Sequence, residues 1–90
     1  MNVFHITRIL HAFDGIDENT GKPIFRKVTI KEDCGLFATK EGALEYIKKD
    51  AKSTDGSLLH FYSSPDEDVY RVPFKDKLEW HYSIKERTIL

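Results

Sequence analysis

The chain has 90 residues, 40% of them hydrophobic and 32% charged, a balance typical of one globular domain rather than a disordered segment. Because 14 Lys and Arg face 15 Asp and Glu, there is no bulk positive charge to draw the chain onto nucleic acid or anionic lipid. No stretch approaches the length of an apolar membrane span, and residues 1–5 lack the features of a signal peptide. The single cysteine, Cys34, forms no intrachain disulfide, which favours a reducing, cytoplasmic location.

The first third of the chain predicts a β-hairpin. Residues 2–12 are rich in β-branched and aromatic side chains, as strands are. Residues 13–23 combine glycines, a proline and acids, which is typical of a polar loop. Residues 24–31 predict a second strand, with one apolar face formed by Ile24, Val28 and Ile30. Phe4, Ile6 and Leu10 share one face of the first strand, and Arg8 lies among them.

A helix is predicted over residues 40–52, with Thr39 as its N-cap. Its apolar stripe is wide enough to cover one face of a sheet. The stripe is formed by Ala43, Leu44, Ile47 and Ala51. Just before the helix, residues 32–36 contain Gly35 and are expected to break the preceding strand.

The last third predicts an antiparallel meander of three strands, at residues 58–63, 68–74 and 78–85. Turns and hydrophobic pattern together set the register of such strands. The register that makes one face apolar throughout pairs Phe61 with Tyr70, Leu59 with Val72, Phe74 with Leu78, Val72 with Trp80, and Tyr70 with Tyr82. The helix stripe is the only cover that the sequence offers for this face. Pro73 cannot donate to a ladder, so the middle strand is expected to end at Val72 or to carry a bulge there.

The same register aligns three basic or titratable side chains on the opposite face, with His60 opposite Arg71 and Arg71 opposite His81. Such a row suits a phosphate or carboxylate, to which Arg71 supplies a bidentate contact. Two imidazoles beside an arginine resist protonation, so a response to pH is also expected. Tyr62 flanks the row, and an apolar rim around a polar centre equally suits a protein partner. A plain solvated face is the alternative, since outward positions of antiparallel sheets are usually polar.

Other chemistry-bearing residues give weaker patterns. His5 and His11 share the outward parity of the first strand, but the chain has no C-x-x-C and no helical H-x-x-x-H spacing, so no metal or cofactor is predicted. Cys34 lies in a predicted loop without a recognisable partner base. The acids of residues 14–18 lack the ligand spacing of a calcium loop. Nucleic-acid binding is disfavoured because the meander's aromatic residues are assigned to the core.

These patterns predict one α+β domain over residues 1–90, an antiparallel sheet of about five strands in the order β-β-α-β-β-β with one helix packed on one face. One helix is only about 10 Å across, so some apolar sheet surface or a strand edge should stay open. Our leading hypothesis is a small non-enzymatic module, such as an accessory or inhibitor protein, that binds a protein partner or a second copy of itself through that edge or face. The alternative is an anion- or nucleic-acid-binding domain that uses His60, Arg71 and His81. An enzyme is disfavoured because no catalytic constellation is recognisable.

Overall fold

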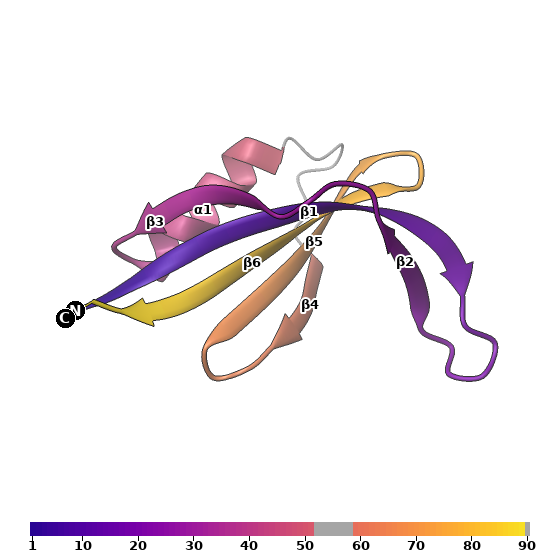
Figure 1. Ribbon diagram of the computed structural model, residues 1–90, viewed down its shortest axis with the longest axis horizontal. Helices are drawn as coiled ribbons and strands as arrows, with labels where there is room; N and C mark the ends of the chain where they lie inside the picture. Colours follow the sequence, from indigo (N-terminus) through magenta and orange to yellow (C-terminus); the bar gives the residue numbers. More distant parts are fainter. Residues whose placement is uncertain (52–58, 90) are drawn as a thin grey trace.

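The computed structural model describes residues 1–51 and 59–89, apart from the side chains of Ala51, Leu59 and Phe74. One curled antiparallel sheet carries a single helix on one face (Figure 1). The elements are β1 (Asn2–Ile16), β2 (Pro23–Lys27), β3 (Glu32–Phe37), α1 (Lys40–Ala51), β4 (Leu59–Ser63), β5 (Glu67–Lys75) and β6 (Leu78–Thr88). The strands lie in the order β2-β1-β6-β5-β4, with β3 also paired to β1. The α+β class and the predicted order of strands and helix are confirmed, with β3 as an addition.

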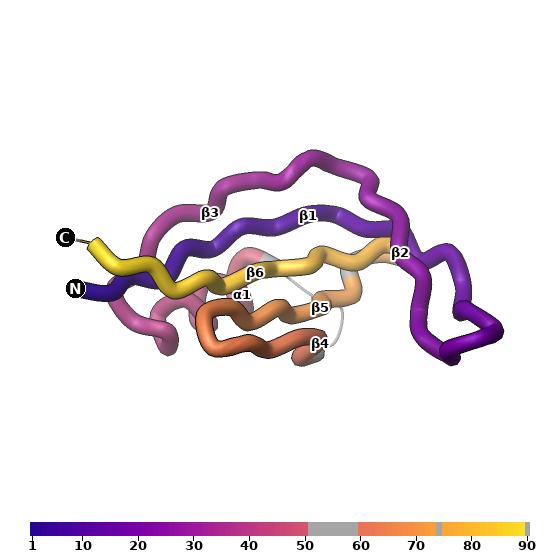
Figure 2. The backbone as a smooth tube through the Cα atoms, turned by 60° about the horizontal axis from the view of Figure 1, so that its bottom comes forward, coloured from indigo at the N-terminus to yellow at the C-terminus, as the bar shows by residue number. Residues whose placement is uncertain are grey.

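The centre of the sheet is the long antiparallel pair formed by β1 and β6. Its ladder runs without interruption from Asn2↔Thr88 to Ala12↔Leu78. The first and last strands are therefore neighbours, and the two chain ends lie side by side (Figure 2). The predicted hairpin of the first two strands is confirmed, but β1 extends to Ile16, beyond the predicted end at residue 12. This extra length carries the tip of the β1–β2 hairpin away from the rest of the sheet (Figure 1).

The strand break expected around Gly35 was wrong, because residues 32–37 form β3. This strand pairs with the N-terminal half of β1, from Phe4↔Phe37 to Arg8↔Glu32. β2 pairs only with the C-terminal half of β1, so the same long edge has room for both short strands. The glycine does disturb the ladder: Gly35 has a φ of 109°, and the register shifts beside it between Ile6 and Thr7. Gly35 therefore makes a bulge rather than a chain break.

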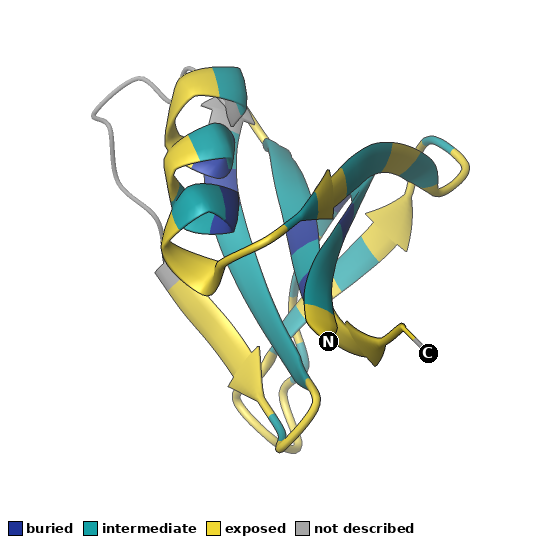
Figure 3. Ribbon diagram, turned by 90° about the vertical axis from the view of Figure 1, so that its left-hand side faces the viewer, coloured by how far each residue is buried: buried dark blue, intermediate teal, exposed yellow. Residues whose placement is uncertain are grey.

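Helix α1 begins as predicted, because Oγ1 of Thr39 accepts a hydrogen bond from the Gly42 amide at 3.0 Å. Its apolar stripe packs onto the sheet, where Ala43 and Ile47 are fully buried (Figure 3). The core between helix and sheet consists of Ile6, Ala43, Ile47, Val72, Tyr82 and Ile84. Trp80 and Tyr70 pack against this core from the sheet, so most of the predicted apolar face of the meander is confirmed.

A charged network closes one end of this core. Arg8 donates to Oδ2 of Asp50 at 2.7 Å and to Oε2 of Glu32 at 3.1 Å, and its guanidinium lies 4.0 Å from the centre of the Trp80 ring. The hydroxyl of Tyr82 donates to the same Asp50 oxygen at 2.6 Å. Burial and this bond to Asp50 raise the pKa of Tyr82, which stays protonated and keeps donating. The network ties β1, β3, α1 and β6 together.

The β5–β6 register is as predicted along most of its length, with Tyr70↔Tyr82, Arg71↔His81 and Val72↔Trp80. The predicted pairing of Phe74 with Leu78 was wrong. Lys75 pairs with Leu78, and the register shifts between Pro73 and Lys75. Because proline cannot donate to the ladder, a bulge here lets the strand continue past it, which is one of the two outcomes expected for Pro73.

Apolar side chains are exposed on β2 and in the segment that follows it. β2 ends at Lys27 rather than at residue 31, and the three apolar side chains of the predicted strand are exposed. These are Ile24, Val28 and Ile30. Within the described residues, α1 is too short and too polar to cross a membrane.

The Tyr82–Asp50 hydrogen bond gives a direct test of the network. Replacing Tyr82 by Phe removes the donor to a partly buried carboxylate, and we expect the free energy of unfolding to fall by about 1–2 kcal/mol. The matched control is Tyr70→Phe, because Tyr70 faces Tyr82 across the β5–β6 ladder and its hydroxyl makes no hydrogen bond to described residues. Urea denaturation measures the free energy of unfolding of both variants, and an equal loss in the two would contradict a stabilising role for the Tyr82–Asp50 hydrogen bond.

Candidate functional site

The face of the sheet opposite the helix, which we call the outer face, carries a cluster of aromatic rings and imidazoles from four strands. His81 on β6 lies at its centre. Its ring stacks on that of His11 with 4.0 Å between centroids and 21° between planes. Phe25 meets it edge to face at 4.7 Å, and Phe61 lies at 5.6 Å. The cluster joins β1, β2, β4 and β6, and Arg71 adds β5. We refer to His11, Phe25, Phe61, Arg71 and His81 as the outer-face cluster.

An ion pair closes one side of this cluster. Nε and NH2 of Arg71 donate to the two carboxylate oxygens of Glu79 at 2.8 and 2.9 Å. The bidentate contact lowers the pKa of Glu79 and raises that of Arg71. The same guanidinium lies 4.9 Å from the centre of the Phe25 ring and 5.5 Å from that of Phe61. Arg71 is therefore committed both to an acid and to two aromatic rings.

His81 is the buried member of the cluster, with only 9% of its side chain exposed. Its Nε2 has no hydrogen-bond partner among the described residues, although Oε1 of Glu79 lies 3.4 Å away. Burial, followed by the proximity of His11, lowers the pKa of His81 to about 4, while Glu79 acts in the opposite direction. The cluster therefore contains a neutral imidazole at neutral pH.

The predicted row of His60, Arg71 and His81 was half right. Arg71 and His81 are paired neighbours, but His60 pairs with Tyr70 and belongs to the helix side of the sheet. The predicted register holds next to the turn, where Tyr62↔Val69 and Ser63↔Asp68 are paired, and then shifts between His60 and Tyr62. Phe61 is the extra residue of this bulge. Its ring is in the outer-face cluster instead of the helix-side core, because it packs there against Phe25 and Arg71.

The bulge gives His60 a different partner. Its Nε2 lies 3.3 Å from Oδ1 of Asp68, which also accepts a hydrogen bond from the Ser63 hydroxyl at 2.8 Å. Lys40 at the start of α1 contacts the other oxygen of Asp68. Burial raises the pKa of Asp68, but the bonds from Lys40, Ser63 and His60 outweigh it and hold the value below its ordinary range. His60 therefore belongs to a salt-bridge cluster that joins the helix to β5.

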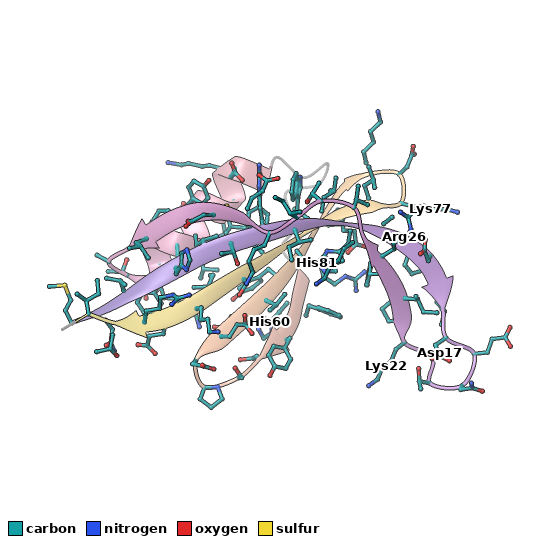
Figure 4. The ribbon with its side chains drawn as sticks, in the orientation of Figure 1. Asp17, Lys22, Arg26, His60, Lys77 and His81 are labelled. Atoms are coloured by element: carbon teal, nitrogen blue, oxygen red, sulfur yellow. The ribbon has the colours of Figure 1, made fainter. Side chains whose placement is uncertain are left out.

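Tyr62, the fourth predicted site residue, lies beside an open groove of about 560 Å³. The groove is lined by Lys22, Pro23, Phe61, Tyr62 and Val69. Its two walls come from different parts of the sheet, the tip of the β1–β2 hairpin and the β4–β5 pair. Figure 4 shows Lys22 and Asp17 at that tip, well separated from His81. The bulge at Phe61 explains the groove, because it turns two consecutive aromatic side chains toward it.

Three members of the cluster were not among the predicted site residues: Phe61, which the predicted register assigned to the core, and His11 and Phe25. His11 and Phe25 lie on strands far from the meander in sequence, and they reach His81 because β1 pairs with β6 and β2 folds beside β1. The outward parity of His11 was visible in the sequence. Its contact with His81 depends on the long-range pairing of the first and last strands, for which a single sequence carries no local signal.

The other candidate residues show no catalytic or metal-binding arrangement. The thiol of Cys34 lies 4.0 Å from the carbonyl oxygen of Glu32, and burial raises its pKa, the opposite of what a nucleophile requires. His5 contacts Asp33 at 3.1 Å on the surface. Across residues 1–51 and 59–89, no three metal-ligating side chains are grouped. Comparisons with known family models, curated proteins and solved structures found no match.

Phe25 is the side chain through which β2 contacts the outer-face cluster, and replacing it by Ala tests that contact. Because the ring is partly buried among His81, Phe13 and Phe61, we expect the free energy of unfolding to fall by about 2 kcal/mol. Ile24→Ala is the matched control. The side chain of Ile24, next to Phe25 on β2, is 45% exposed, so we expect the free energy of unfolding to fall by less than about 1 kcal/mol. Thermal or urea unfolding distinguishes the two, and a larger loss at Ile24 would contradict the assignment.

Proposed function

We propose that this protein is a non-enzymatic interaction module whose partner adds an extended segment to strand β4 and inserts apolar side chains into the adjacent groove. The observation that carries the proposal is the exposure of two consecutive aromatic side chains on an edge strand, Phe61 at 47% and Tyr62 at 52%. Exposed aromatic residues beside a groove are typical of protein-binding surfaces. A cytoplasmic location is part of the proposal and is supported by the single cysteine.

The edge of β4 is the first support. Among the described elements, β4 pairs only with β5, which leaves one side of its backbone without a described strand neighbour. Natural edges are usually protected by lysine, proline or short length. The opposite edge has such protection, because β2 contains Pro23, Arg26 and Lys27. β4, with the sequence LHFYS, is as short as β2 but has no lysine or proline, so short length is its one protection among these and a partner strand meets neither a charge of that kind nor a missing donor.

The groove specifies the chemistry of the partner. Phe61, Tyr62, Val69 and Pro23 provide an apolar lining for a bulky aliphatic or aromatic side chain. Lys22 on the hairpin wall forms no ion pair within the part of the chain that is described, and it offers its charge to an acid on the partner. The expected partner segment is therefore extended, with alternating apolar residues and an acidic residue near one end. A second copy of this chain is a different outcome, which the experiment identifies.

The anion-binding alternative has less support. It requires the guanidinium of Arg71 to be open to a ligand, whereas Glu79 already takes its Nε and one terminal nitrogen. It also requires His60 beside Arg71, and His60 lies on the other face with Asp68. The interaction module is the function that the geometry favours.

Photo-crosslinking in the native cell tests the proposal. With benzoylphenylalanine replacing Tyr62, we expect a discrete crosslinked adduct whose partner peptide is extended and contains bulky apolar residues. The same probe replacing Leu36 on β3, which is 58% exposed near the other edge, is the control and should give no matching adduct. An adduct to a copy of the same chain would identify a homodimer, and an adduct only from position 36 would contradict the β4 site.

Affinity measurements with the captured peptide complete the test. Tyr62→Lys places a charge in the apolar groove, and we expect it to weaken binding at least about 10-fold by isothermal titration calorimetry. Leu36→Lys, on the other edge, should leave the affinity unchanged. If both variants bind as the wild type does, the groove is not the binding site.

A further inference from the structure

Phe25 holds the β1–β2 hairpin against the rest of the outer face. The backbone of β2 pairs with β1 over four residue pairs, with one register shift. Among the described residues, the Phe25 ring makes the aromatic contacts from β2 to strands β4, β5 and β6. The nearest ring to Phe25 is that of His81, at 4.7 Å. Whatever moves or charges His81 therefore acts directly on the contact that keeps the hairpin in place.

The surroundings of His81 suit a neutral imidazole. From β1 it faces the imidazole of His11, from β5 the guanidinium of Arg71, and from β6 the carboxylate of Glu79. Among the described side chains of β2 and β4, it faces the rings of Phe25 and Phe61. The carboxylate is already held by two nitrogens of Arg71, so a proton on His81 would find its one acidic neighbour engaged. Lys27 on β2 is in register with His11, so β1 lies between its backbone and that of His81.

We propose that protonation of His81 releases the β1–β2 hairpin from the outer face, so that the groove loses one wall in acid. The charged ring is poorly accommodated between a stacked imidazole and an arginine at 9% exposure, and it gains water only when Phe25 withdraws. Attraction of the cation to the neighbouring rings of Phe25 and Phe61 opposes this release, and the experiment measures the balance.

The groove depends on the same contact. Lys22 and Pro23 form its hairpin wall, and Phe61 belongs both to the groove and to the outer-face cluster. Release of the hairpin would separate the two walls. By linkage, a partner that binds the intact groove makes His81 harder to protonate, and acid weakens the partner's affinity by the same factor. This consequence rests on the proposed function, whereas the release of the hairpin does not.

The sign and size follow from the two protonation equilibria. The closed form has a pKa of about 4 at His81, whereas an open form that exposes the ring has an ordinary value near 6.5. The open form therefore binds the proton more tightly, and opening becomes more favourable as the pH falls from 6.5 toward 4. Between pH 7 and pH 5 the opening equilibrium should rise about 20-fold.

Amide hydrogen exchange of the free protein tests the release, with rates corrected for the intrinsic effect of pH. We expect the opening constant reported by the amides of residues 24–27 to rise about 20-fold from pH 7 to pH 5, while amides of the β5–β6 ladder change much less. His81→Phe keeps an aromatic ring in the cluster without a titratable group and should abolish the rise. His81→Gln is the second variant, in case the phenylalanine variant fails to fold.

The proposal is overturned by an opening constant for β2 that does not change between pH 7 and pH 5, or by the same change in the wild type and in both His81 variants. His11→Gln identifies the responsible ring, since a response lost with His11→Gln but kept in the His81 variants would also overturn it. The exchange experiment uses no partner, so its result is independent of crosslinking at position 62. Release of the hairpin can be observed where crosslinking fails, and crosslinking can succeed where no release is observed. The captured peptide tests the link. From pH 7 to pH 5 the wild-type affinity should fall by the ratio of the closed fractions that the exchange data give at the two pH values, and the affinity of His81→Phe should not fall.

Discussion

The pairing of the first and last strands is the constraint on which the rest of this structure depends. β1 and β6 share a ladder from Asn2↔Thr88 to Ala12↔Leu78, and every other strand is attached to one of them directly or through β5. Closing a contact across nearly the whole chain costs loop entropy, which only extensive burial repays. That burial comes from both faces of the pair, because successive side chains on β6 alternate between helix and outer face.

The two faces are stabilised by different chemistry. On the helix side, Ile6, Val72 and Ile84 pack under α1, and the Arg8–Asp50–Tyr82 network closes the end of the core. On the outer face no second element covers the sheet within the described residues, and the sheet covers itself by curling, with Phe25 and Phe61 brought over His81. A cluster built in this way is smaller than the core under the helix and includes titratable groups. It is therefore the part of the fold most open to change by pH or by a partner.

The candidate site was predictable where local rules decide it. The alternation of both strands correctly predicted the pairing of Arg71 with His81, although the predicted pairing next to the β5–β6 turn was wrong, and Tyr62 reached the outer face as parity required. His60 could not be placed correctly, because one extra residue at Phe61 reverses parity for everything before it. The bulge places Phe61 among Phe25 and Arg71, and these lie on strands that only the tertiary fold brings near.

The sequence by itself determined the class of fold, the start of the helix at Thr39, the hairpin and the meander, since capping, periodicity and turn composition act over a few residues. The tertiary structure decided what depends on distant neighbours: the β1–β6 ladder, the use of residues 32–37 as a strand, the contact of His11 with His81, and the groove between hairpin and edge. The physical reason is that local preferences are encoded in adjacent residues, whereas a long-range pairing wins only through the total surface it buries, which no single segment reveals.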